Sequence, residues 1–307
     1  MLVATAAADD QKKDPGRIGN RDVGGGINFY SLEKERALGK QLAEEVERQA
    51  RLSDDPILSE YINRIGQNLV RNSDARYPFT FRVIEADQPN AFALPGGYIF
   101  VHTGLIKMAD EEAELAAAMA HEIAHVAARH MTRQATKSQL LSLATVPLSV
   151  LLGGWAGYGA RQAAGAALPF AALRFSRQDE SEADLLGIQY AYAAGYDPAA
   201  AIVLFEKLGS LERQKPGWMG RLLSTHPPSG ARLANVQRQI EKLLPARPEY
   251  VVNTSTYMEI RERVFQSQDE TRGKTQGEQP VLRTHPSASG DGPSETGPVI
   301  RRRDRVE

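Results

Sequence analysis

The chain has 307 residues, enough for one large domain or two ordinary ones. It carries 37 lysine and arginine residues against 38 aspartate and glutamate residues, a net charge of −1, and lacks the basic excess of proteins that coat nucleic acid or anionic membranes. Because it has no cysteine, disulfides, thiol catalysis and cysteine-bound metal centres are excluded, and any metal must be bound by histidine, aspartate or glutamate.

The two ends of the chain differ in composition from its middle. The first eight residues are small or apolar and resemble the last part of an export signal, although a short irregular terminus is an equal alternative. Residues 9–30 are polar and rich in glycine, so residues 1–30 are expected to form a disordered tether. From about Gln266 polar residues, glycine and proline dominate, which predicts a disordered tail over 263–307 and a folded domain over 31–262.

In chain order, the apolar residues first follow a helical period and then a strand period. Phe79, Phe81 and Val83 alternate with polar residues and predict a strand, and two more strands are expected on either side of Pro95-Gly96-Gly97. Helical spacing predicts helices over the ranges 31–50, 56–70, 111–137, 175–194 and 230–244, with one more starting at 197. The expected fold is therefore of the α+β class, mainly helical, with a small early β-sheet.

The centre of the sequence holds the pattern HExxH at His121, Glu122 and His125. Residues four apart on a helix differ by about 40° in direction, so both imidazoles project from one face and can bind one metal ion. Glu122 lies about 100° from His121, where it can hold a water molecule without binding the metal. The neighbouring residues are mostly apolar, which favours a buried helix over one with two surface histidines, and buried histidines need a partner.

A zinc site with an open position for water needs a third protein ligand. His130 follows His121 by nine residues, half a turn around a continuous helix, and is expected to face away, either toward solvent or behind the ligands. Glu180 and Asp184 are better candidates, because they lie on a face of small residues that can pack closely against the alanines of the HExxH helix. Spacing alone leaves these two carboxylates as rivals, and Glu182 is expected to be solvated.

These motifs together resemble a known family. HExxH at 121–125, followed by Ser-Arg-Gln-Asp-Glu-Ser-Glu-Ala-Asp at 176–184, is similar to the zinc peptidases that include HtpX, BepA and the CAAX prenyl endopeptidases. Asn-Ala-Phe-Ala at 90–93 and Thr-His-Pro-Pro at 225–228 occur in the order expected for that family. The resemblance covers about residues 31–245 and is greatest to the BepA-like soluble envelope members, without the TPR repeats that such proteins can carry.

The resemblance implies a zincin-like metallopeptidase fold and a set of roles at the site. One zinc ion would be bound by His121, His125 and Glu180, with Asp184 orienting a ligand and Glu122 acting as the general base. The edge strand would bind the substrate backbone as an added β-strand, through residues Asn90, Ala91, Phe92 and Ala93.

His226 has three interpretations. The resemblance places the matching histidine close to the zinc, either as an occluding fourth ligand or as a donor to the oxyanion that forms during hydrolysis. The third interpretation is a capping or packing histidine in front of the helix at Gly230. Arg232 is expected to assist His226.

Residues 140–160 form an uncharged run long enough to cross a bilayer. A single crossing between His125 and Glu180 would put two ligands of one metal on opposite sides of the membrane, and the next apolar segment, at 162–173, is too short to return. A transmembrane span is therefore rejected, which leaves a lid over the site or a hairpin that contacts a membrane surface.

The sequence thus favours a zinc-dependent metalloendopeptidase that hydrolyses misfolded or misassembled envelope polypeptides and has no nucleic-acid partner. The alternative is a latent or chaperone-like zinc protein whose site is closed by His226. A periplasmic or envelope location is expected if a signal is missing before Met1, and a cytoplasmic one if Met1 is the true start.

Overall fold

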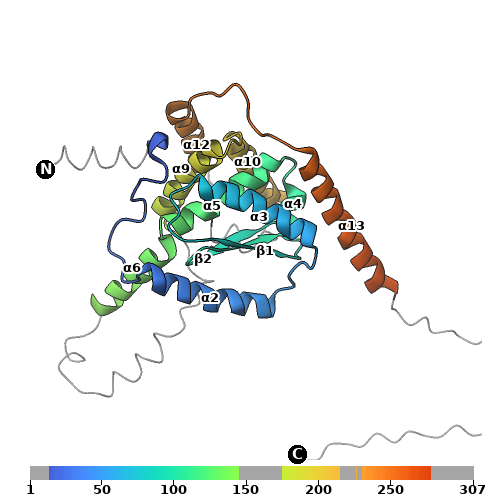
Figure 1. Cartoon of the computed structure of the whole chain (residues 1–307), viewed down its shortest axis with the longest axis horizontal. Coiled ribbons are helices and arrows are strands. Elements are labelled where there is room, and N and C mark those ends of the chain that lie inside the picture. Colours follow the sequence, from blue (N-terminus) through green and yellow to red (C-terminus); the bar gives the residue numbers. More distant parts are fainter. Residues whose placement is uncertain (1–13, 145–174, 215–225, 227–229, 278–307) are drawn as a thin grey trace, which may run out of the picture. The chain divides into compact units, whose positions relative to one another are not determined.

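The computed structural model describes residues 14–144, 175–214, 226 and 230–277 (Figure 1). The strands are β1 (Thr80–Ile84), β2 (Ala91–Leu94) and β3 (Tyr98–His102), and the helices are η1 (Pro15–Arg17), α2 (Leu32–Gln49), α3 (Pro56–Arg71), α4 (Thr103–Met108), α5 (Glu112–Ala127), α6 (His130–Ala144), α9 (Arg177–Ala193), α10 (Ala200–Gln214), α12 (Gly230–Leu243) and α13 (Ser255–Gly277). The mainly helical α+β fold with a small early sheet is therefore confirmed.

The small sheet has the strand order β1-β3-β2. β1 pairs with β3 in parallel and β2 pairs with β3 antiparallel, so β2 is an edge strand within the part of the chain that the structure describes. The turn that joins β2 to β3 places Gly96 and Gly97 at φ +75° and +93°, a conformation that favours glycine. A Cβ added to Gly96 would lie 2.5 Å from the Cα of Arg36 on α2, so this turn also needs glycine for close packing.

The sheet lies between α2 on one face and the helices α3 and α5 on the other (Figure 1). The alternation predicted for the strands decides which side chain meets which layer. Phe81, Val83 and Ile99 join the main core with α3 and α5, whereas Phe100 and Leu94 pack with α2. The edge strand β2 is thereby held directly beside α5.

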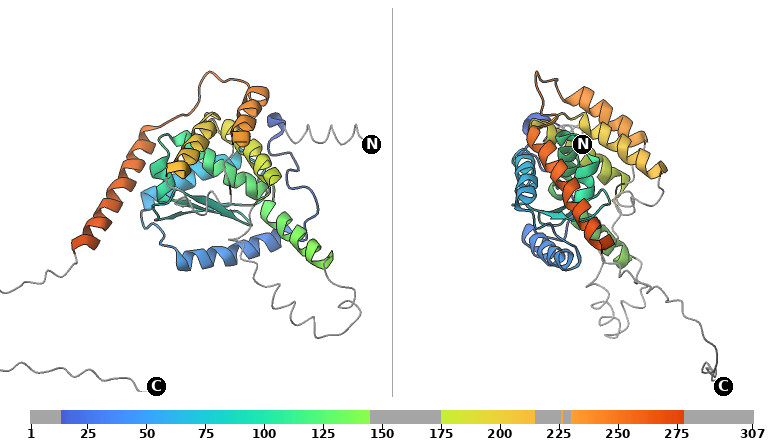
Figure 2. Two further views of the ribbon diagram at one scale, coloured as in Figure 1. Left: turned by 180° about the vertical axis from the view of Figure 1, so that it is seen from behind. Right: turned by 90° about the vertical axis from the view of Figure 1, so that its right-hand side faces the viewer.

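Helix α9 packs along α5, the helix that carries the HExxH residues (Figure 2). The small residues of the two helices allow this close approach, as the sequence predicts. A Cβ added to Gly187 would lie 3.1 Å from both the backbone N and the Cα of His121. The two helices therefore meet backbone to backbone at the level of the first histidine.

The helix expected over 111–137 is two helices. α5 ends at Ala127, and α6 begins at His130 after a turn in which Arg129 has φ +57°. The guanidinium of Arg129 pairs with the buried carboxylate of Glu35 at 2.8 Å and donates to the backbone carbonyl of Tyr30. The break contains no glycine or proline, so the sequence pattern gave no sign of it.

The ends of the described chain are more firmly packed than the composition suggests. Residues 14–30 were expected to belong to a tether, but Arg21 is 5% exposed and its guanidinium lies 2.6 Å from Asp74. At the other end, α13 continues past the expected boundary at 262, and its Val264 is buried in the main core. Residues 1–13 and 278–307, on which the other terminal predictions fall, lie outside the described residues.

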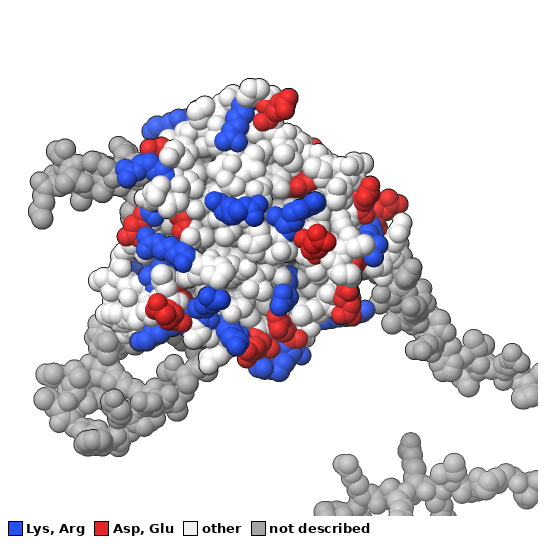
Figure 3. Space-filling view, in the orientation of Figure 1, with Lys and Arg blue, Asp and Glu red and all other residues white. Residues whose placement is uncertain are grey.

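The described helices and surface charges bear on the expected relation of the chain to membranes. None of the helices within the described ranges combines the length and hydrophobicity needed to cross a bilayer. Most of the uncharged run at 140–160, for which a lid or a membrane hairpin was predicted, lies outside the described residues. Basic and acidic side chains are interspersed on the face shown in Figure 3, in keeping with the near-zero net charge.

Candidate active site

Helix α5 presents His121 and His125 from one face, one turn apart, as the spacing predicts. Their Nε2 atoms lie 3.0 Å from each other. His125 and Glu122 are both buried, because α5 runs between the sheet and α9. The two imidazoles thus converge on one point at the end of a buried helix face.

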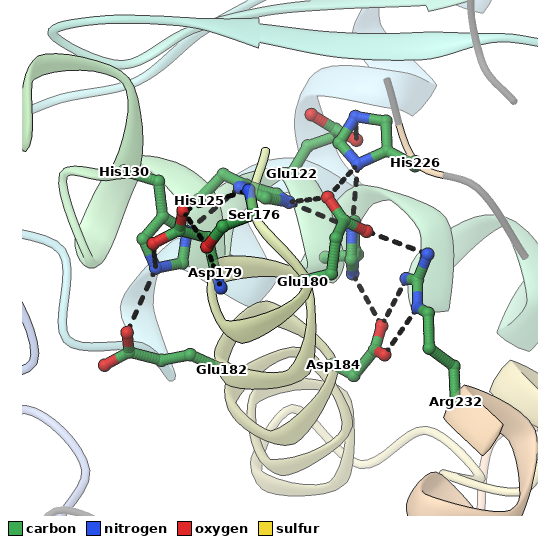
Figure 4. A network of polar contacts seen from close by, with 11 residues as sticks. Glu122, His125, His130, Ser176, Asp179, Glu180, Glu182, Asp184, His226 and Arg232 are labelled. Carbon is green, nitrogen blue, oxygen red and sulfur yellow. Dashed lines mark hydrogen bonds and ion pairs between the residues drawn. The ribbon is translucent and has the colours of Figure 1, made fainter. Parts of the chain in front are cut away.

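Helix α9 brings two carboxylates to this point (Figure 4). The helix starts with a capping box in which Ser176 and Asp179 exchange hydrogen bonds, and this start fixes Glu180 one turn into the helix. The Oε1 atom of Glu180 lies 3.4 Å from His125 Nε2, and its Oε2 atom lies 3.6 Å from His121 Nε2.

Asp184 contacts the opposite side of the His121 ring. Its Oδ1 atom lies 3.2 Å from His121 Nδ1, whereas Glu180 faces the Nε2 atoms of both histidines. The geometry therefore separates the two carboxylates that spacing left as rivals. Glu180 stands with the converging nitrogens, and Asp184 is placed to orient a ring by accepting its N–H.

His226 joins the same group of atoms from the segment between α10 and α12. Its Nδ1 atom lies 2.8 Å from Glu180 Oε1 and 3.3 Å from His121 Nε2, and its Nε2 atom lies 3.6 Å from Glu122 Oε1. The ring is buried, with 8% of its surface exposed. His226 therefore contacts both the converging donors and the side chain expected to be the base.

The donor set fits a zinc ion. One atom each from His121, His125, Glu180 and His226 can be chosen so that all lie within 4.8 Å of one another. Nearest separations among these donors run from 2.8 to 3.6 Å, and ligands at ~2.0–2.1 Å in a tetrahedron are ~3.3 Å apart. Two ring nitrogens this close can share only one proton in a hydrogen bond. A cation bound by all of the donors at once satisfies more of their lone pairs.

Arg232 binds the two carboxylates of α9 from α12. Its Nη1 lies 2.8 Å from Glu180 Oε2, and its Nε and Nη2 donate to the two oxygens of Asp184 at 2.9 and 2.7 Å. Burial raises the pKa of Asp184, but the hydrogen bonds from Arg232 and His121 outweigh it and lower that pKa. Arg232 was expected to assist His226, and the structure instead places it on the carboxylates (Figure 4).

Burial and hydrogen bonding shift the pKa values of the site residues in different directions. Burial lowers the pKa of His121, but hydrogen bonds to Asp184 and Glu180 outweigh it and raise that pKa to about 10. Burial also lowers the pKa of His125 and raises that of Glu122. A buried glutamate with a raised pKa is a better proton acceptor than an exposed one, which suits a general base.

His130 is fully buried behind His125, so it lies behind the ligands, one of its two expected positions, but its ring points toward the site rather than away from it (Figure 4). Its Nδ1 atom lies 3.0 Å from His125 Nδ1, and its Nε2 atom lies 3.2 Å from Glu182 Oε2. The expectation assumed one continuous helix, whereas the turn at Arg129 brings the ring back to the site. Glu182, expected to be solvated, is half-buried between His130 and Arg133.

The edge strand lies beside the expected base. Among the described residues β2 has β3 on one side only, and the backbone N–H of Ala93 donates to the Glu122 carboxylate, although burial still raises the pKa of Glu122. The side chain of Ala91 lines the same cavity as His121 and Glu122. Of the residues expected to bind substrate, Ala91 and Ala93 are thus next to the metal-binding group, whereas the side chain of Phe92 packs against Phe100 on the α2 side of the sheet.

Comparison with known sequences gives the class to which this fold and site belong. The sequence profile of peptidase family M48 matches residues 56–240, a range that contains β2, α5, α9 and the α12 arginine. The chain therefore belongs to peptidase family M48.

Individual members of known function give more specific relatives within this family. The chain is 34% identical over 224 residues to the beta-barrel assembly-enhancing protease of Escherichia coli (strain K12), which covers 70% of this chain and 45% of that protein. It is 35% identical over 224 residues to the protein of the same name from Yersinia pestis, covering 70% and 46%. It is 36% identical over 196 residues to the mitochondrial metalloendopeptidase OMA1 of Schizosaccharomyces pombe, covering 60% and 52%. The chain thus spans about half the length of these relatives.

Proposed function

We propose that this chain is a zinc-dependent metalloendopeptidase. The observation that carries the proposal is the convergence of His121, His125 and Glu180 on one point, with the buried carboxylate of Glu122 beside it. A zinc ion held by these three residues would supply a Lewis acid and make water a stronger acid. The membership of the chain in peptidase family M48 supports the proposal.

The remaining chemistry comes from the side chains of the chain itself. Glu122 would accept a proton from the attacking water and deliver it to the nitrogen of the leaving amine. Asp184, held by Arg232, would accept the Nδ1 proton of His121 and keep its Nε2 free to bind the metal. The free edge of β2 would hold the peptide as an added strand, so that recognition depends on the main chain.

The relatives suggest the setting. Two of them are named for enhancing β-barrel assembly and one is a mitochondrial metalloendopeptidase. We infer that this chain acts on misfolded or misassembled polypeptides of the cell envelope, in the periplasm or at the envelope. Main-chain recognition with little sequence preference suits such substrates.

The test compares the wild type with Glu122→Gln, measuring casein hydrolysis and bound zinc in both proteins. Glu122→Gln should retain one zinc per chain and lose at least ~100-fold in activity, since general acid–base catalysis contributes about 10²–10⁴-fold. Glu259→Gln, on the exposed face of α13, is the matched control and should behave as the wild type. Equal activity of the wild type and Glu122→Gln would contradict the mechanism, and a wild type that binds no zinc would contradict the site.

The position of His226 favours a second, related function: a latent enzyme closed by a fourth ligand. Its Nδ1 atom lies within the group of donor atoms that could bind the metal, 2.8 Å from Glu180 Oε1. If His226 occludes the site, His226→Ala should keep zinc and hydrolyse casein faster than the wild type. Activity that falls with zinc retained would instead support the role of His226 as a donor to the oxyanion.

A further inference from the structure

A cavity, partly open to solvent, extends from the catalytic residues into the space between the helices. His121, Glu122 and His226 line one part of it, together with Ala91 of the edge strand. The cavity therefore begins where the peptide bond to be cleaved would lie.

Asp184 of α9 and Arg232 of α12 also line the cavity beside the catalytic residues, and the rest of its wall is apolar and comes mainly from four helices. The lining residues that define it are Ala117 and Ala118 of α5, Ile188 of α9, Leu204 and Leu208 of α10, and Val236 of α12. Leu208, Ile188 and Val236 belong to the hydrophobic core, so this wall is set by the packing of the domain. Apolar walls that a folded core holds open favour an apolar guest, whereas a charged guest would lose its hydration.

We propose that this cavity is a specificity pocket that takes the apolar side chain, of leucine, methionine or phenylalanine size, next to the scissile bond of a polypeptide substrate. The inference rests on the proposed function and adds to it the class of residue at which cleavage occurs. Successive residues of an extended peptide are ~3.3 Å apart. With the scissile bond at Glu122, a side chain that enters a cavity lined by Glu122 and His121 belongs to a residue flanking that bond.

The alanines of α5 explain why the pocket exists. Ala117 and Ala118 lie one turn before His121, and Ala117 packs with Ala201 of α10. Larger residues there would fill the space beside the metal-binding histidine. The small residues thus keep the cavity continuous with the catalytic group.

The first experiment maps cleavage sites in denatured casein and denatured lysozyme by mass spectrometry, using the zinc-loaded full chain. Leucine, isoleucine, methionine or phenylalanine should be enriched at one of the two positions flanking the cut. In a synthetic peptide that carries one such site, replacing that residue by alanine should lower kcat/KM ~10-fold or more. Cleavage without enrichment at either position would overturn the pocket and leave the proposed function intact, whereas no cleavage at all would count against the proposed function.

The second experiment changes the pocket in opposite directions. Ala118→Leu narrows it and should shift preference from phenylalanine toward valine and alanine, whereas Leu208→Ala widens it and should shift preference toward phenylalanine. Val203 of α10 is 39% exposed, so Val203→Ala is the matched control and should leave the substrate preference unchanged.

Zinc content and thermal unfolding show whether each variant is folded. A peptide-binding measurement on the same pocket changes in the Glu122→Gln background gives a readout without turnover, in which affinities should follow the same order. Folded variants that keep the wild-type preference in both readouts would overturn the proposal.

Discussion

The Nδ1 atom of His130 lies 3.0 Å from the Nδ1 atom of His125, on the side of that ring opposite the converging Nε2 atoms. If His125 binds a metal through Nε2, its Nδ1 carries the proton and donates it to His130. His130 is then protonated at Nε2 and donates to Glu182, 3.2 Å away. The buried row Glu182–His130–His125 would fix the tautomer and the ring plane of a metal ligand.

This relationship predicts that His130→Ala weakens zinc binding. Loss of such a partner typically lowers metal affinity about 10–100-fold, so the dissociation constant for zinc should rise by that factor in competition with a chromophoric chelator. His102→Ala, which removes a histidine from β3 and not from the site, is the control and should bind zinc as the wild type does. A His130→Ala affinity within about twofold of the wild type would contradict the role given to the row.

The backbone contact between α5 and α9 predicts opposite effects for two glycine-to-alanine changes. Gly209→Ala, on α10, places its Cβ at an ordinary 3.6 Å from a flexible arginine and should stabilise the fold by about 0.5–1 kcal/mol through helix propensity. Gly187→Ala gains the same propensity but places its Cβ 3.1 Å from the backbone of His121. It should therefore lose that gain and bind zinc more weakly.

Urea unfolding and zinc titration of both glycine variants test this difference. A Gly187→Ala protein as stable as Gly209→Ala, with unchanged zinc affinity, would show that the helices can separate without harm to the site.

The buried pair Arg21–Asp74 predicts that the segment before α2 stabilises the domain. Both side chains are at most 1% exposed, and Arg21 also donates to Gln189 of α9 at 2.6 Å. Arg21→Ala leaves a buried carboxylate without its cation and should lower the free energy of unfolding by about 3–5 kcal/mol, measured in urea. Arg17→Ala, an exposed change nearby, should alter it by less than ~0.5 kcal/mol. Equal stability of the two variants would show that residues 14–30 act only as a tether and do not stabilise the domain.

The N-cap of α3 predicts a pH-dependent contribution to stability. Burial raises the pKa of Asp55, but hydrogen bonds from Arg263 and from the backbone N–H groups of Leu58 and Ile57 outweigh it and lower that pKa. A carboxyl group with a lowered pKa stabilises the fold above its unfolded pKa of ~3.9, and this stabilisation is lost as pH falls through the folded pKa.

Asp55→Asn keeps the cap and removes the charge, so it should be less stable than the wild type at pH 7 by up to ~1 kcal/mol. The difference should shrink below about pH 4. Asp54→Asn, on an exposed neighbour, should show no such dependence in urea unfolding at the two pH values. A gap between Asp55→Asn and the wild type that stays constant down to pH 3 would rule out the carboxylate as its source.

Much of the fold and the centre of the site could be predicted because they rest on local periodicity. His121, Glu122 and His125 share a helix whose apolar pattern is unambiguous, and Glu180 lies on a second helix of small residues. The separation of Glu180 from Asp184 depends on which ring nitrogen each one meets, and spacing within one helix does not contain that information.

The errors arose where a single residue redirects the chain or where the partners are distant in sequence. Arg129 adopts φ +57° because Glu35 and Tyr30 hold its guanidinium, and no turn residue marks the site. The direction expected for the His130 ring was wrong as a direct result. Arg21 finds Asp74 53 residues away, and a contact between segments so far apart leaves no periodic trace in a polar stretch.

The edge strand β2 is only four residues long, about 13 Å of extended backbone. If a substrate pairs with it as proposed, the enzyme offers hydrogen bonds for a very short stretch of main chain, and a folded protein keeps such stretches paired within its own sheets. The edge strand would then bind only those substrates that have backbone groups without hydrogen-bond partners. A misassembled polypeptide exposes such groups at unpaired strands, and a correctly folded one does not.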